Sequence, residues 1–152
     1  MILQAVYDHL KTVSALTSIV GSDPCRIFYG IAPPRVKDSF GIDQKVKPPY
    51  IVYDLIGGDN YEHMTGETGL AGARFRFEFT EVTSLKAELL YDTFRQNVNT
   101  ANHTTWGTTR IESVQVEDPF DITVDGFSGL VQESPAFQCQ VEILYHRTIA
   151  SP

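Results

Sequence analysis

The most regular pattern in the chain is ARFRFEFTE, residues 73–81, in which apolar and charged side chains alternate for three full periods. Phe75, Phe77 and Phe79 share one side, whereas the residues between them are charged. A strict period of two is typical of a half-buried β-strand. We therefore expect a strand with one face in the core and the other in contact with water or a partner.

Two other stretches carry apolar residues every three or four positions, as amphipathic α-helices do. The first, residues 2–20, is followed by Gly21, a common helix stop. The second, residues 84–99, follows Thr83 and begins with Ser84, either of which can cap it. The apolar stripes are Leu3, Val6, Leu10, Val13, Leu16 and Val20 in the first, and Ala87, Leu90, Phe94 and Val98, flanked by Leu85 and Leu89, in the second.

The remaining apolar segments are short and rich in β-branched and aromatic residues, which favours strands. In one of them Ile111 is out of phase with Val114 and Val116, and this predicts a β-bulge. Another is expected to form a long-armed antiparallel hairpin with the phenylalanine strand. The four segments are residues 25–30, 50–56, 108–118 and 136–148.

Three further segments lack sustained periodicity, and we expect loops at 31–48, 57–72 and 119–135. Loops of this length in a compact domain are usually functional or disordered. Two helices and about five alternating strands predict an α+β fold, an antiparallel sheet with both helices on one face. At 152 residues the chain is expected to form a single domain, residues 1–152.

The net charge of −7 argues against broad binding to nucleic-acid backbones, but it does not exclude a protein that DNA passes through. The apolar N-terminal stretch is interrupted by Asp8, His9 and Lys11, so we expect neither a signal peptide nor a membrane span. Cys25 and Cys139 are expected to be reduced thiols in the core.

The chain carries no motif that we recognise as catalytic or metal-binding. Residues 121–132 begin like a calcium loop, but position three is Thr123, and position twelve, which should be a bidentate Glu, is Gln132. The glycines of 57–72 are not followed by Gly-Lys-Ser or Gly-Lys-Thr, so they do not form a phosphate-binding loop. The four histidines lack ligand spacing. We expect no enzymatic activity, no cofactor and no metal, while Trp106 leaves a ligand-binding role open.

Charge is sorted between two of the predicted loops. The segment 31–48 holds four of the twelve basic residues, and the segment 117–133 holds five acidic residues and no basic one. Such runs are usually solvated faces, but opposite charges on two long segments also fit self-association through complementary patches. The candidate interface residues are Arg35, Lys37, Lys45 and Lys47 in the basic segment, and Asp121, Asp125 and Phe127 in the acidic segment.

Five segments follow one another in a recognisable order. They are the N-terminal helix ending in VG, the stretches RIFYGIAPP and PPYIVYDLIGG, the strand and helix RFRFEFTEVTSLKAELLYDTFRQNV, and the final FQCQVEILYHR. From about residue 2 to residue 147, this succession resembles the tail-completion proteins of long-tailed bacteriophages, also called tail terminators or head–tail joining proteins. The segments 31–48 and 119–135 are longer here than in the shorter members of that family.

The resemblance implies an α+β fold and a homohexameric ring. Such a ring caps the finished tail tube and contacts the head connector protein, and DNA passes through its channel without specific binding. It further implies a structural protein of the virion, located at the head–tail junction and in the host cytoplasm during assembly, with no catalytic residues. Two alternatives stay open: a head-side connector or neck protein of similar fold, and a monomeric ligand-binding α+β domain with a pocket near Trp106.

Overall fold

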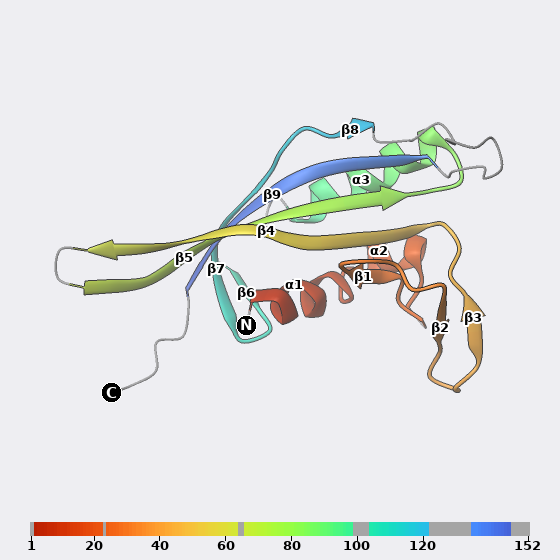
Figure 1. The fold of residues 1–152 in the computed structure, drawn as a ribbon, viewed down its shortest axis with the longest axis horizontal. Helices are drawn as coiled ribbons and strands as arrows, with labels where there is room; N and C mark the ends of the chain where they lie inside the picture. Colours follow the sequence, from red (N-terminus) through yellow and green to blue (C-terminus); the bar gives the residue numbers. More distant parts are fainter. Residues whose placement is uncertain (1, 23, 64–65, 99–103, 122–134, 147–152) are drawn as a thin grey trace.

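A computed structural model of the 152-residue chain describes residues 2–22, 24–63, 66–98, 104–121 and 135–146 (Figure 1). These ranges contain three helices and nine strands, which form an α+β fold. The helices are α1 (Ile2–Leu10), α2 (Ser14–Val20) and α3 (Ser84–Val98). The strands are β1 (Ile27–Tyr29), β2 (Arg35–Lys37), β3 (Asp43–Lys45), β4 (Tyr50–His63), β5 (Gly66–Thr80), β6 (Thr104–Trp106), β7 (Thr109–Val116), β8 (Phe120–Asp121) and β9 (Ala136–His146).

Most of these strands belong to one sheet, in the order β1-β4-β5-β9-β7-β6, with β8 pairing the start of β9. Its neighbours are antiparallel except β1 and β4, which run parallel. The expected antiparallel sheet of about five strands is therefore corrected to a mixed sheet with seven described strands. The parallel pair arises because the chain leaves β1 through a separate β2–β3 hairpin before it starts β4, instead of turning back directly.

The phenylalanine side of β5 is buried, as its alternation predicts. Phe77 is 1% exposed, and its ring stacks on Tyr53 of β4 and contacts Phe94 of α3, with ring centroids 5.4 and 4.7 Å away. Cys139 of β9 is the cross-strand partner of Phe77, and burial raises the pKa of its thiol to about 12. Residues of all three helices join the same cluster, so the helices cover one face of the sheet.

The long N-terminal helix predicted for residues 2–20 is divided in two. The hydroxyl of Thr12 donates a hydrogen bond of 2.6 Å to the carbonyl of His9, a group that a continuing helix would pair with the amide of Val13. Val13 is extended, with φ −79° and ψ 101°, and α2 begins after it. The apolar stripe itself is correct, because Val6, Leu10 and the stripe residues of α2 are buried.

The second helix and the bulge are confirmed. Helix α3 spans Ser84–Val98, and the hydroxyl of Thr83 accepts a hydrogen bond of 3.2 Å from the amide of Lys86, which makes Thr83 its cap. The pairing of β7 with β9 shifts register between Ile111 and Ser113. The strand expected at 108–118 is shorter, and it pairs with a strand, β6, that we did not predict.

The pairing of β4 with β5 is confirmed, but the loop predicted for residues 57–72 is wrong. Strand β4 continues into these residues as far as His63 and β5 begins at Gly66, so the two strands form a long arm. A Cβ atom added to Gly58 would lie 3.0 Å from the carbonyl oxygen of Gly72, so glycine allows the two backbones to approach closely. Gly58 and Gly72 therefore allow β4 and β5 to stay paired here, where the sequence alone predicted that the glycines would end the strands.

The loop predicted for residues 31–48 is also wrong in part, because it contains the antiparallel β2–β3 hairpin, in which Arg35 faces Lys45. Its strands have three residues each and are mostly exposed, and such strands leave no apolar alternation in the sequence. The segment 119–135 contains the short strand β8, and its residues 122–134 lie outside the described ranges.

Candidate interaction surfaces

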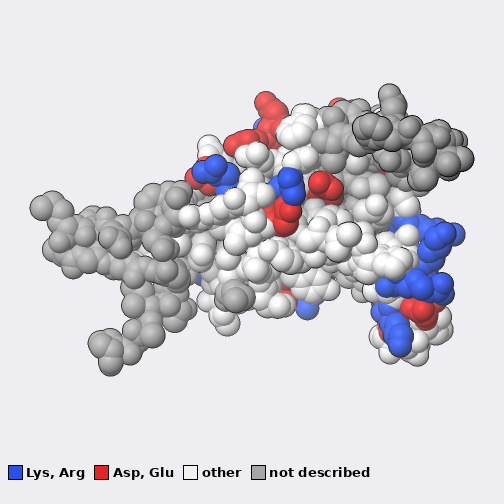
Figure 2. Space-filling view, in the orientation of Figure 1, with Lys and Arg blue, Asp and Glu red and all other residues white. Residues whose placement is uncertain are grey.

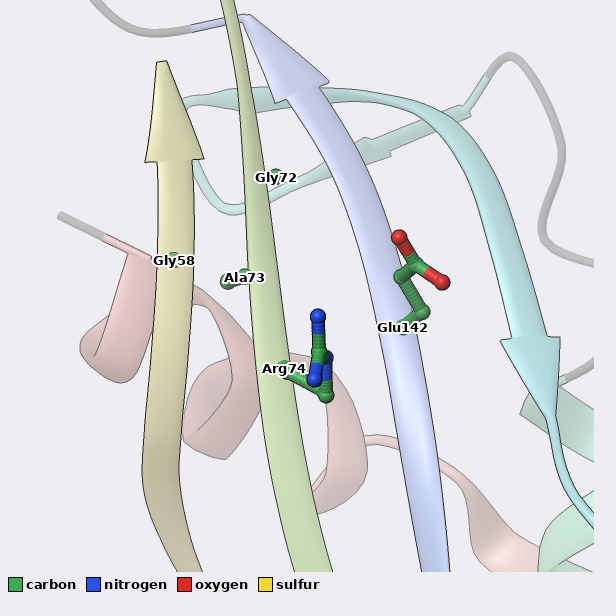
Figure 3. A pocket seen from close by; sticks show the side chains of 5 residues that line it. All are labelled: Gly58, Gly72, Ala73, Arg74 and Glu142. Atoms are coloured by element: carbon green, nitrogen blue, oxygen red, sulfur yellow. The ribbon is translucent and has the colours of Figure 1, made fainter.

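The described residues show neither a cluster of metal-ligating side chains nor a membrane-spanning helix. Among them no three His, Cys, Asp or Glu side chains lie together as a metal ion would require. No described helix is long and apolar enough to cross a membrane. A cavity of about 10 Å³ between β4, β5 and β9 is lined by Gly58, Gly72, Ala73, Arg74 and Glu142 (Figure 3). That volume suits about one water molecule and no organic substrate.

The sheet face opposite the helices is polar where β4, β5 and β9 run side by side. Arg76 of β5 and Asp54 of β4 form an ion pair of 2.6 Å, and the hydrogen bond to Asp54 raises the pKa of Arg76. Arg74 is the cross-strand partner of Glu142 on β9, and Figure 3 shows both side chains on this face, with the helices behind the sheet. Complementary charge on neighbouring strands stabilises this face in water.

The four basic candidates gather on one projecting element. Arg35 and Lys37 lie on β2, Lys45 lies on β3, and Lys47 follows directly. Figure 2 shows Lys and Arg concentrated on this hairpin, at the lower right of the view. Arg35 also forms an ion pair of 2.8 Å with Asp43 across the hairpin. The hairpin is thus a basic projection with its own internal support.

The hairpin tip, residues 38–42, is apolar and tightly hydrogen-bonded. One carboxylate oxygen of Asp38 accepts hydrogen bonds from the amides of Phe40 and Ile42, both 2.9 Å, and the other accepts one from Gln44. Gly41 has φ +78°, a conformation that glycine adopts without strain. The result is a fixed turn that holds Phe40 84% exposed and Ile42 58% exposed.

Of the candidates in the acidic segment, Asp121 alone lies among the described residues. Asp121 ends β8 and pairs with Phe137 of β9, and Asp125 and Phe127 lie outside the described residues. Figure 1 shows β8 at the top of the molecule and the β2–β3 hairpin at the lower right, below β4. The described end of the acidic segment therefore lies away from the hairpin within this subunit, and a contact between the two charged segments of different molecules stays a prediction.

An apolar groove lies between α2, α3 and the start of β4. We call it the α3 groove; its volume is about 390 Å³, and Ile19, Pro49, Leu89 and Leu90 line it. Val82 lines it as well and is exposed, as are Leu85 and Leu89 on the adjoining surface of α3. Glu81 and Lys86 are its polar lining residues. A large apolar surface left open to water marks a binding surface more often than a solvated one.

Trp106 of β6 lies in the core. It is 2% exposed, and its indole stacks on the imidazole of His9, with ring centroids 4.3 Å apart and planes 4° from parallel. The Nε2 atom of His9 and the Nε1 atom of Trp106 are buried and have no hydrogen-bond partner among the described residues. Burial lowers the pKa of His9. The stacked rings connect α1 to β6, so Trp106 contributes to the packing of the fold.

The sequence-based reasoning missed the apolar part of both surfaces. Phe40 and Ile42 stood in a segment noticed only for its charges, although two large apolar residues around a glycine are unusual in a solvated loop. Leu85 and Leu89 were noted as flanking the helical stripe. Because they are four positions apart, they lie on one side of α3, away from its buried stripe. That spacing in the sequence indicates an exposed apolar face.

Comparison with known proteins gives a match in structure and none in sequence. No family model and no curated protein matches the chain. A chain in the solved structure described as the virion of a native gene transfer agent particle is similar over 94% of this chain and 92% of its own length. The TM-score is 0.64 and the sequence identity is 14%. At this identity the match establishes a shared fold over nearly the whole of both chains.

Proposed function

We propose that this chain is a structural protein of a phage or phage-like virion, in which a ring of its copies terminates the tail tube and joins it to the head connector. The observation that carries the proposal is the fold shared with a chain of the gene transfer agent virion over 94% of the length. The order of sequence segments that resembles tail-completion proteins supports the same assignment independently.

The surfaces of the chain agree with an assembly role. In a cyclic ring each subunit contacts its two neighbours through two different patches, which must complement each other. The chain presents two unlike exposed features, the basic hairpin with its apolar tip and the α3 groove. With no cluster of metal-ligating side chains among its described residues, its contribution is proposed to be contact and not catalysis.

The test is to find the chain in particles. Particles made by the genome that encodes it are separated into mature virions, isolated tails and isolated heads, and each fraction is probed with an antibody against the chain. We expect the chain in mature virions and in tails that have not joined heads. Loss of its gene is expected to leave heads and tails unjoined.

Other outcomes decide between the alternatives. Presence on isolated heads and absence from isolated tails would favour a head-side connector. Absence from all particles, together with a monomer at every concentration in sizing experiments, would overturn the structural role and favour a ligand-binding domain. A hexamer by native mass spectrometry would support the ring.

A further inference from the structure

The tip of the β2–β3 hairpin is held in a fixed shape but is not buried by its own subunit. Three hydrogen bonds to Asp38 order the turn, and yet Phe40 remains 84% exposed. Ordering a turn that presents a phenylalanine to water has no benefit for the isolated subunit, because the ring gains no apolar contact there. An apolar contact for Phe40 would therefore come from outside the described part of its own subunit.

The α3 groove is a second unsatisfied apolar surface of the same subunit. Its volume of about 390 Å³ exceeds the needs of bound water, and most of its lining is apolar. On the neighbouring surface of α3, Leu85 is 68% exposed. A groove of this kind accepts an apolar side chain presented on a rigid element.

We propose that the hairpin tip of one copy of this chain docks into the α3 groove of a second copy, with the ring of Phe40 between Leu89 and Val82. This contact rests on the self-assembly proposed above and names the surfaces that would carry it. The two surfaces differ from each other, as head-to-tail association between identical subunits requires.

Charge favours the same pairing. Residues 35–47 carry four basic and two acidic side chains, for a net charge of +2, whereas residues 81–92 carry three acidic and one basic, for a net charge of −2. Lys45 on the stem of the hairpin and Glu88 and Asp92 on α3 are exposed. Opposite charges around an apolar centre speed association and select the partner. A second copy thus presents an apolar surface to the hairpin tip and a segment of opposite net charge to its stem.

Disulfide trapping between two variants tests the contact. One chain carries Phe40→Cys and the other carries Leu89→Cys, both with Cys25→Ser so that the buried Cys139 is the only other thiol. After the two are mixed and mildly oxidised, we expect a disulfide-linked dimer that contains one copy of each. The matched control replaces Leu89→Cys with Thr105→Cys, an exposed position on β6, and is expected to give at least tenfold less dimer.

The outcomes separate the possible occupants of the groove. Segment 122–134 of the same chain is one, because it leads into Pro135, whose carbonyl accepts a hydrogen bond from the amide of Glu81. A disulfide within one chain between Phe127→Cys and Leu89→Cys would place that segment in the groove and overturn the proposal. Oligomers that form without the Phe40–Leu89 cross-link would also overturn it, while leaving the proposed virion role intact.

Charge reversal gives a second, independent test. The double variant Lys45→Glu and Lys47→Glu is expected to weaken association at least tenfold in sedimentation experiments. Reversal of Glu88 and Asp92 to Lys on the partner is expected to restore a large part of the loss. Restoration by Asp121→Lys and Asp125→Lys instead would assign the hairpin to the acidic segment and overturn the groove contact.

Discussion

The β4–β5 and β2–β3 hairpins place phenylalanine in opposite surroundings. On the β4–β5 hairpin Phe77 is buried under α3 with other aromatic rings around it, whereas on the β2–β3 hairpin Phe40 is exposed at the tip of a turn. Burial of Phe77 contributes to folding, since its contacts lie within the subunit. Phe40 has no such contacts to lose, and its apolar surface is available for association. The difference separates the apolar residues that stabilise the fold from those that we propose to serve assembly.

The two hairpins also differ in how they keep their shape. A layer of helices supports the inner face of β4 and β5, and the sheet continues on both sides of the pair. The β2–β3 hairpin has three residues in each strand and depends on Asp38, Gly41 and the Arg35–Asp43 ion pair. Polar anchors of this kind fix a local turn without adding to the core, so the tip can change with little effect on the rest of the fold.

Phe77→Ala tests the buried side of this comparison and should have the largest effect. Removing a fully buried phenylalanine loses its apolar burial and leaves a cavity, so we expect the free energy of unfolding to fall by about 3–5 kcal/mol. Urea denaturation followed by circular dichroism measures this. The control is Arg76→Ala, on the opposite face of β5, where a partly exposed ion pair contributes about 1 kcal/mol or less. Equal losses from the two variants would contradict the assigned faces.

Asp38→Ala tests whether the exposed hairpin depends on its polar anchor. The change removes the acceptor of two backbone amides, so we expect their hydrogen exchange at Phe40 and Ile42 to accelerate by about tenfold, or 1–2 kcal/mol. Global stability should change by less than about 0.5 kcal/mol. Asp38→Asn is the matched control, because its amide oxygen can still accept both bonds. Unchanged exchange in Asp38→Ala would mean that strand pairing alone holds the tip.

The buried region was predictable from sequence and most of the exposed region was not. Alternation along β5 identifies the buried phenylalanines, because residues two positions apart in a strand lie on the same face of the sheet. No comparable signal marks β2, β3 or the arm at 57–72, since short polar strands lack alternation and glycine indicates a loop unless the pairing partner is known. The basic candidates could be chosen by charge alone. The apolar tip and the α3 groove required the structure, because exposure depends on what packs nearby.

His9 offers a smaller test, in a ring buried between α1 and β6. Burial holds its pKa below the ordinary value of 6.5, so the unfolded chain binds the proton more readily than the folded one. The contribution of the neutral His9 ring to the free energy of unfolding is therefore fully present above pH 6.5. It is lost as the pH falls below 6.5, and the free energy of unfolding then decreases by at most about 1.4 kcal/mol per pH unit. The free energy of unfolding should depend on pH in this way only between pH 6.5 and the lower pKa that His9 has in the folded state.

The measurement compares the free energy of unfolding of the wild type and His9→Phe at several pH values. The substitution keeps an aromatic ring against Trp106 and removes the titration. The difference between the two proteins should be constant above pH 7 and should move in favour of the variant below pH 6.5. His146→Phe is the control at an exposed histidine, which hydrogen-bonds to Glu112. The same drift in both variants would show that burial of His9 is not its cause.

Phe40→Ala should have the smallest effect on folding and is for that reason the sharpest test of the comparison. In dilute solution, where association is absent, we expect the free energy of unfolding to change by less than about 0.5 kcal/mol, because an exposed ring contributes few contacts. At high concentration the wild type should gain stability, since association stabilises the folded state by mass action, and the variant should not. Phe120→Ala, another exposed phenylalanine, controls for the loss of apolar surface in general. A loss of more than about 2 kcal/mol in dilute Phe40→Ala would place this ring in the fold of its own subunit, and the distinction between the two hairpins would then fail.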